Sequence, residues 1–345
     1  MNLPQPDSLQ PDRGNPPLYN NGNYSENGNG ASSSAHRPKT GAASSVGSGV
    51  PHGASAGAAH AAAPAQPGAN AMPPPPGMGM VGAAATAFKL DHLKSGRDSL
   101  ARGDIAKAHE HFLTVVQHSP ECAEAYLGMG QVHAARNQSQ MAYDFYSRAL
   151  ELEPALAPAW AERGRIRFAA GNDKEALRDL DRAIGLQPDL AEAWSCLGQL
   201  HLSRQRFGDA LMALERASLL APQDSHTWHQ LALALVGMKQ LPRALDAYEV
   251  CLRLEPAKPT IWREKASLQE RMGKLAEALA SVEQGLALNP HSHGAWFLKC
   301  YILYRLKRHA QMLQAGLQAV RIRKDHALSW HLLGYAYNEL SQFDE

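Results

Sequence analysis

The chain lacks the features that mark a membrane or secreted protein. Its 345 residues contain no apolar run long enough to span a bilayer. The first ten residues carry no basic stretch followed by an apolar core, as a signal peptide would. The formal net charge at pH 7 is only +1, so charge gives no reason to expect nucleic acid or an anionic membrane as a partner. We therefore expect a soluble cytoplasmic protein, with the nucleus as the alternative compartment.

Residues that bind metals or carry out catalysis are sparse or poorly placed. The four cysteines lie far apart in the sequence, and we interpret them as small apolar side chains of a core. Among the sixteen histidines, His226 and His229 share one face of a helix, but no third ligand accompanies them at a zinc-like spacing. There is no G-x-x-x-x-G-K-S/T loop, and no G-x-G-x-x-G opens a helix after a strand. We predict no enzyme activity, no metal and no cofactor.

The chain does contain a strict period of thirty-four residues. Its tryptophans all fall on this spacing, at Trp160, Trp194, Trp228, Trp262, Trp296 and Trp330. A column of prolines has the same spacing and always precedes an aromatic residue by six positions, at Pro120, Pro154, Pro188, Pro222, Pro256 and Pro290. Such a period indicates an array of stacked repeats rather than a closed globule.

The period divides the chain into seven repeats and part of an eighth. Their bounds are 89–122, 123–156, 157–190, 191–224, 225–258, 259–292, 293–326 and 327–345. The aromatic column is position 4 of each repeat, and positions 8, 20 and 27 are kept small. Spacings of three and four place positions 4, 8 and 11 on one helix and positions 20, 24 and 27 on a second. The proline at position 32 ends the second helix.

Each repeat is therefore predicted to be a helix, a short turn and a second helix. We expect the large aromatic residue of position 4 to fill the gap beside the small residue of position 8. Residues that break a helix stand between the two helices in several repeats, for example Gly103, Asn137, Gly171 and Gly273.

These columns resemble the tetratricopeptide repeat, which has an aromatic residue at position 4, glycine or alanine at 8, alanine at 20 and 27, a bulky residue at 24 and proline at 32. The resemblance implies an all-α fold, a right-handed superhelix of helix-turn-helix repeats over residues 89–345. It also implies that the concave surface binds a segment of a partner protein. Arg163, Lys265 and Lys299 depart from the pattern at position 7, and we expect their stems to run past the aromatic ring.

The first 88 residues have a different composition. They are rich in Asn, Gly, Ser, Ala and Pro and contain six charged residues and no tryptophan. Because such a segment cannot bury enough apolar surface to offset the entropy of ordering, we predict a disordered arm over residues 1–88. Residues 77–87 would be a flexible lead into the first helix. The prolines 73–76 favour a short polyproline II segment, which we interpret as a linker rather than as a ligand for an aromatic groove.

The sequence stops at Glu345, before the second helix of the eighth repeat. Trp330 and Tyr337 would then present an apolar face of the kind that a further helix covers. We therefore expect the sequence to be a fragment, with self-association through this uncovered C-terminal face as one consequence.

Two binding signatures of the resembled family are missing from the first helices. Cochaperones of the family bind carboxylates through lysine at position 5 and asparagine at position 9, and the O-GlcNAc transferase superhelix carries a ladder of asparagines at position 6. Neither pattern is present. Aromatic and basic residues gather instead in the last three repeats, at Arg263, Arg271, Phe297, Tyr301, Tyr304, Arg305, His331 and Tyr335.

These eight residues are our candidate peptide-binding residues, because aromatic and arginine side chains contribute most of the energy of peptide interfaces. We expect an acidic and apolar segment as the ligand. Packing between neighbouring first helices explains the same residues almost as well. The predicted function is a non-enzymatic scaffold or adaptor, and two alternatives stay open: the substrate-recruiting region of a larger enzyme, such as a glycosyltransferase, and an adaptor of the transcriptional corepressor type.

Overall fold

The computed structural model describes residues 78–340, and this part of the chain consists of fifteen helices and the turns between them. The first helices of the repeats are α1 (Met78–Ala101), α3 (Ala123–Ala135), α5 (Ala157–Ala169), α7 (Ala191–Ser203), α9 (Ser225–Gly237), α11 (Pro259–Arg271), α13 (His293–Arg305) and α15 (Ala327–Glu339). The second helices are α2 (Ile105–His118), α4 (Ser139–Leu152), α6 (Asp173–Leu186), α8 (Phe207–Leu220), α10 (Leu241–Leu254), α12 (Leu275–Leu288) and α14 (His309–Ile322).

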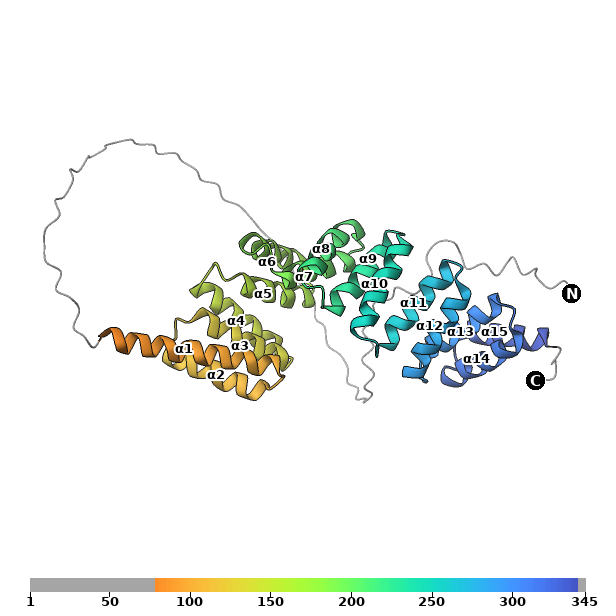
Figure 1. Ribbon diagram of the computed structural model, residues 1–345, viewed down its shortest axis with the longest axis horizontal. Coiled ribbons are helices and arrows are strands. Elements are labelled where there is room, and N and C mark those ends of the chain that lie inside the picture. The colour runs from red at the N-terminus through yellow and green to blue at the C-terminus, as the bar shows by residue number, and fades with distance from the viewer. Residues whose placement is uncertain (1–77, 341–345) are drawn as a thin grey trace, which may run out of the picture. The chain divides into compact units, whose positions relative to one another are not determined.

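The helices pack in chain order, as Figure 1 shows for the series from α1 to α15. Each first helix packs most extensively against the second helix of its own repeat, and that second helix packs against the first helix of the next repeat. First helices also contact one another across repeats, as in α5 with α7 and α13 with α15, whereas second helices make no comparable contacts with each other in residues 78–340. The predicted all-α array of helix-turn-helix repeats is confirmed.

The start of the first helix differs from the prediction. α1 begins at Met78, so the flexible lead expected over residues 77–87 is helical from Met78 onward. The reason is local: four of the residues between Gly82 and Phe88 are alanines, which have the highest helix propensity, and no proline follows Pro76 until Pro120. The disordered arm and the polyproline segment were predicted for residues that lie mostly outside the described part of the chain.

Every turn between the two helices of a repeat contains one residue with positive φ, always at position 15. The residues are Gly103 (φ 77°), Asn137 (58°), Gly171 (80°), Gln205 (57°), Lys239 (59°), Gly273 (78°) and Lys307 (56°). The N–H of position 15 donates to the carbonyl of position 12, and the N–H of position 16 donates to the carbonyl of position 11. This pattern is a Schellman motif, in which a left-handed residue ends a helix.

A hydrogen bond joins the tryptophan column to the proline column. The indole Nε1–H of Trp160 donates to the backbone carbonyl of Pro154 at 2.9 Å, and the next four tryptophans donate to their own prolines in the same way. Trp330 donates to the carbonyl of Lys324, which replaces the proline. The two columns share one period because position 4 of each repeat bonds to position 32 of the repeat before it.

The gap beside position 8 is filled by a different residue from the one predicted. Gly130 faces the ring of Tyr146, and Gly198 faces Leu214, so the side chain of position 24 occupies this space. A Cβ atom on either glycine would overlap that side chain. The tryptophan lies instead beside position 27, where Gly285 faces Trp262. The small residue of position 8 thus makes room for the side chain of position 24, and the small residue of position 27 makes room for the tryptophan of position 4.

The basic residues at position 7 do run past the aromatic ring, as predicted. The guanidinium carbon of Arg163 lies 4.6 Å from the Trp160 ring centroid, and the ammonium groups of Lys265 and Lys299 lie 5.6 and 5.5 Å from the rings of Trp262 and Trp296. The two lysines also form ion pairs with Glu249 and Glu283, which belong to the second helix of the preceding repeat. These side chains therefore connect neighbouring repeats.

Candidate peptide-binding surface

Four of the candidate residues form what we call the aromatic surface: Phe297, Tyr301 and Tyr304 of α13 and Tyr335 of α15. All four are half-buried and pack against the apolar core of the last repeats. The rings of Tyr301 and Tyr304 stack with centroids 6.3 Å apart, and the edge of Tyr335 meets Tyr304 at 4.9 Å. The three tyrosines therefore form one continuous surface across two repeats.

Phe297 lies one turn away and has other neighbours. Its ring stacks with His293 at 6.4 Å and meets His326 edge-on at 5.0 Å. The two histidines come from the start of α13 and from the residue that precedes α15. Phe297 thus joins the aromatic surface to the junction between the seventh and eighth repeats.

The hydroxyls of Tyr301 and Tyr335 are neutral at physiological pH. Burial raises the pKa of Tyr301, and the negative charge of Glu270 raises it further, while Arg305 acts in the opposite direction. Burial also raises the pKa of Tyr335. Each phenol can therefore donate a hydrogen bond to a ligand carboxylate or carbonyl, while its ring offers an apolar face.

Arg305 is already paired inside the protein. Its Nη1 contacts the carboxylate of Glu270 and donates to the backbone carbonyl of the same residue at 3.1 Å. The side chain of Glu270 is only 11 % exposed, so its charge depends on this arginine. Arg305 therefore ties α13 to α11, and it is poorly placed to bind a carboxylate of a ligand.

Arg263 and Arg271 on α11 have no such partner. Arg263 is half-buried and its guanidinium lies against Gly294 of the next repeat, whereas Arg271 is exposed in the last turn of α11. Neither forms an ion pair with any residue between 78 and 340. His331 on α15 is exposed. The two arginines are the cations of the candidate set that remain available to an anionic ligand.

Polar contacts that the sequence did not reveal connect neighbouring first helices. The hydroxyls of Ser195 and Thr227 lie 3.0 Å apart, and Nε2 of His229 lies 2.7 Å from the Glu264 carboxylate. His226 contacts Gln230 instead, so the two histidines considered as metal ligands do not converge. Within residues 78–340, no group of three or more His, Cys, Asp or Glu side chains could hold a metal ion.

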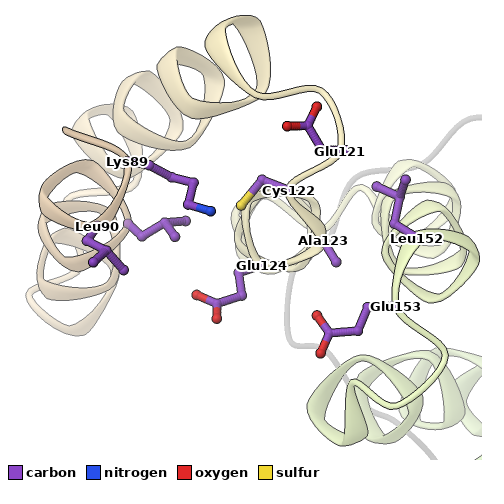
Figure 2. A pocket seen from close by; sticks show the side chains of 9 residues that line it. Lys89, Leu90, Glu121, Cys122, Ala123, Glu124, Leu152 and Glu153 are labelled. Atoms are coloured by element: carbon purple, nitrogen blue, oxygen red, sulfur yellow. The ribbon is translucent and has the colours of Figure 1, made fainter. Parts of the chain in front are cut away.

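A separate hollow of about 380 Å³ lies at the other end of the array, between the middle of α1 and the start of α3 (Figure 2). Lys89 extends from α1 toward the start of α3, and Leu152 closes the hollow from the end of α4. Three glutamates line it, namely Glu121, Glu124 and Glu153. The hollow is thus mainly acidic, in contrast to the two unpaired arginines of α11.

Comparison with known families agrees with the repeat geometry. Family models described as tetratricopeptide repeats match residues 93–158, 164–205 and 236–300. The chain belongs to the tetratricopeptide repeat family. Sequence comparison with curated proteins finds no match for this tetratricopeptide repeat protein.

Solved structures support the same fold. The chain resembles a structure described as a functional characterisation of Pseudomonas aeruginosa PilF, with 21 % identity, a TM-score of 0.53, and coverage of 65 % of this chain and 98 % of that one. It also resembles the APC/C hetero-tetramer Cut9–Hcn1, with 17 % identity, a TM-score of 0.53, and coverage of 72 % of this chain and 52 % of that one. At these identities the likeness concerns the tetratricopeptide fold alone. No helix within residues 78–340 is long and apolar enough to cross a membrane.

Proposed function

We propose that this tetratricopeptide repeat protein is a non-enzymatic adaptor that binds a segment of a partner protein on the aromatic surface. One observation carries the proposal: three tyrosines from two repeats form a continuous, half-exposed set of rings, with the unpaired Arg263 and Arg271 on the adjacent first helix. A surface used only for packing would not require two unpaired arginines on the neighbouring first helix.

The chemistry of this surface favours an acidic and apolar ligand. The tyrosine rings offer apolar faces with hydroxyls that can donate hydrogen bonds. Arg263 and Arg271 can bind carboxylates bidentately or stack on aromatic side chains. Such a ligand would be an extended or helical segment in which apolar residues alternate with Asp or Glu. The four cysteines are all buried and free, which suits a reducing cytoplasmic or nuclear compartment.

The outer face of α15 supports a weaker, second proposal of self-association. Leu328 and Trp330 are 58 % and 50 % exposed, whereas Trp228 in the middle of the array is half-buried. Large apolar side chains exposed on this helix favour association with a second copy.

A panel of synthetic peptides tests the partner class. Three fluorescent fifteen-residue peptides would alternate leucine with glutamate, lysine or serine, and fluorescence anisotropy would measure their binding to the full chain. We expect the glutamate peptide to bind at least about ten-fold more tightly than the lysine peptide, a difference of about 1.4 kcal/mol. Added salt should weaken the glutamate peptide more than the serine peptide. Equal or stronger binding of the lysine peptide, or no binding of any peptide, would contradict the proposal.

A further inference from the structure

The junction between the seventh and eighth repeats contains two histidines that share one buried serine. Nδ1 of His326 lies 2.8 Å from the hydroxyl of Ser329, and Nε2 of His293 lies 3.2 Å from the same hydroxyl. Ser329 is only 1 % exposed. The two imidazole rings meet edge-on with centroids 4.6 Å apart. We call these three residues the histidine junction.

His326 also serves as the N-cap of α15. Its Nδ1 accepts a hydrogen bond from the backbone N–H of Ser329, at 3.3 Å. Three other helices in the described part of the chain have an N-cap that uses its side chain, and those caps are Asp104, Asp224 and Ser292. His326 is the one cap in this set that gains a positive charge near neutral pH.

The hydrogen bonds determine where the protons lie. A backbone N–H can only donate, so Nδ1 of His326 must present its lone pair, and the proton of this ring must be on Nε2. When the single hydroxyl proton of Ser329 points to His326, Nε2–H of His293 donates to the hydroxyl oxygen. Both rings are then neutral. A proton added to Nδ1 of His326 would place one N–H against another and remove the cap of α15.

The surroundings also disfavour a charged imidazole. Burial lowers the pKa of His326, Arg323 at the end of α14 lowers it further, and Asp325 in the turn opposes both. Burial lowers the pKa of His293 in the same way, and His326 and Arg323 add to the effect against Asp325. From α13 the neighbouring ring is the uncharged Phe297. Each histidine thus takes up a proton more readily in the unfolded chain than in this junction.

We propose that the histidine junction is a proton-sensitive contact that holds α15 in place only while both imidazoles are neutral. The sign follows from the direction of the pKa shifts. Because the folded-state pKa of each ring lies below its ordinary value of 6.5, the stabilisation is present above that value and is lost as the pH falls below it. Mild acid should therefore release α15.

Release of α15 would also change the aromatic surface. Tyr335 belongs to α15 and contacts Tyr304, and Phe297 contacts His326. Acidification would separate Tyr335 from the other tyrosines. We therefore expect ligand affinity to fall in mild acid, and this consequence rests on the proposed function. The release of α15 does not depend on the proposed function.

Hydrogen–deuterium exchange of the full chain tests the junction directly. Protection of the amides of α15 would be measured between pH 8 and pH 5.5 and corrected for the intrinsic effect of pH on exchange. We expect α15 to lose protection by roughly three-fold or more as the pH falls, while α5, which contains no histidine, stays protected. Unchanged protection of α15 across this range would overturn the proposal.

Two matched variants identify the group responsible. His326→Asn keeps a side-chain acceptor that caps a helix well but does not titrate, so protection of α15 should depend less on pH than in the wild-type protein, with only the contribution of His293 left. His331→Asn changes an exposed histidine of the same helix and should leave the pH dependence of the wild-type protein unchanged. Full pH dependence in His326→Asn would also overturn the proposal.

The glutamate peptide separates the two proposals. If α15 loses protection in acid but the peptide binds at no pH, the proposed function fails and the histidine junction stands. If the peptide binds at pH 7.5 and α15 keeps its protection at pH 5.5, the junction fails and the proposed function stands.

Discussion

At the scale of single residues, position 15 shows how one backbone conformation is imposed on unequal side chains. Four repeats place glycine or asparagine there, and these residues adopt positive φ at low cost. Gln205, Lys239 and Lys307 take the same conformation with φ between 56° and 59°. Because an ordinary side chain in this region costs about 1–2 kcal/mol, the three residues store strain that the Schellman hydrogen bonds offset.

The contrast between glycine and longer side chains at position 15 predicts opposite effects of two substitutions. Lys239→Gly should raise the free energy of unfolding by about 0.5–1 kcal/mol, because relief of strain exceeds the added entropy of the unfolded chain. Gly171→Ala should lower it by about 1 kcal/mol, since alanine would be forced into the left-handed region. Urea denaturation followed by circular dichroism measures both. Lys174→Gly inside α6 is the control and should destabilise; destabilisation by Lys239→Gly as well would contradict this explanation.

The sequence predicted position 15 only in part. Gly103, Asn137, Gly171 and Gly273 could be identified as turn residues because glycine and asparagine adopt left-handed backbone more readily than other residues. Glutamine and lysine carry no such signal, so the corresponding turns had to be inferred from the period. The partner of the tryptophan column was also mistaken, because spacing along a helix gives the face of a residue but not the residue that fills the opposing gap.

At the scale of helices, each tryptophan fixes the start of a first helix against the end of the preceding second helix. The indole hydrogen bond accounts for the constant six-residue interval between position 32 and position 4. Trp228 has a complete set of neighbours, including α10 of its own repeat. Trp330 keeps the hydrogen bond but lies on α15, for which no second helix is described.

Removal of the two tryptophans should therefore have unequal effects. Trp228→Ala should lower the free energy of unfolding by about 3 kcal/mol, whereas Trp330→Ala should cost less than that because half of its surface is already exposed. Denaturant titrations of the two variants provide the comparison. Similar costs would contradict a linear array in which each repeat depends on its neighbours. Sedimentation of Trp330→Ala should also show less self-association than the wild-type protein.

At the scale of the whole molecule, the fold could be predicted more completely than its internal contacts. The period alone predicted the pairs of helices that the structure shows, because thirty-four residues are enough for one supersecondary unit of two helices. The polar contacts between repeats, such as Ser195 with Thr227 and His293 with Ser329, were not predictable. The two residues of each contact occupy different positions of the repeat, so the comparison of equivalent positions does not connect them.

The candidate site illustrates the same limit. Position within the repeat correctly placed Tyr301, Tyr304 and Tyr335 on neighbouring first helices, where the structure brings their rings together. The position within the repeat could not show that Arg305 is paired with Glu270. The two residues are thirty-five residues apart, so they occupy different positions of the repeat. The available cations are consequently Arg263 and Arg271.

The central claim is that the aromatic surface and the arginines of α11 bind a partner segment. The most direct test measures, on the same variant, both the affinity for the glutamate peptide and the thermal midpoint. For Tyr301→Ala combined with Arg271→Ala we predict at least about ten-fold weaker binding, or about 1.4 kcal/mol, with only a modest fall in the midpoint because Tyr301 is half-buried. Arg305→Ala is the matched control, and it should lower the midpoint because Glu270 loses its partner. Unchanged affinity in the double variant, with a large fall in its midpoint, would show that these residues only pack helices together.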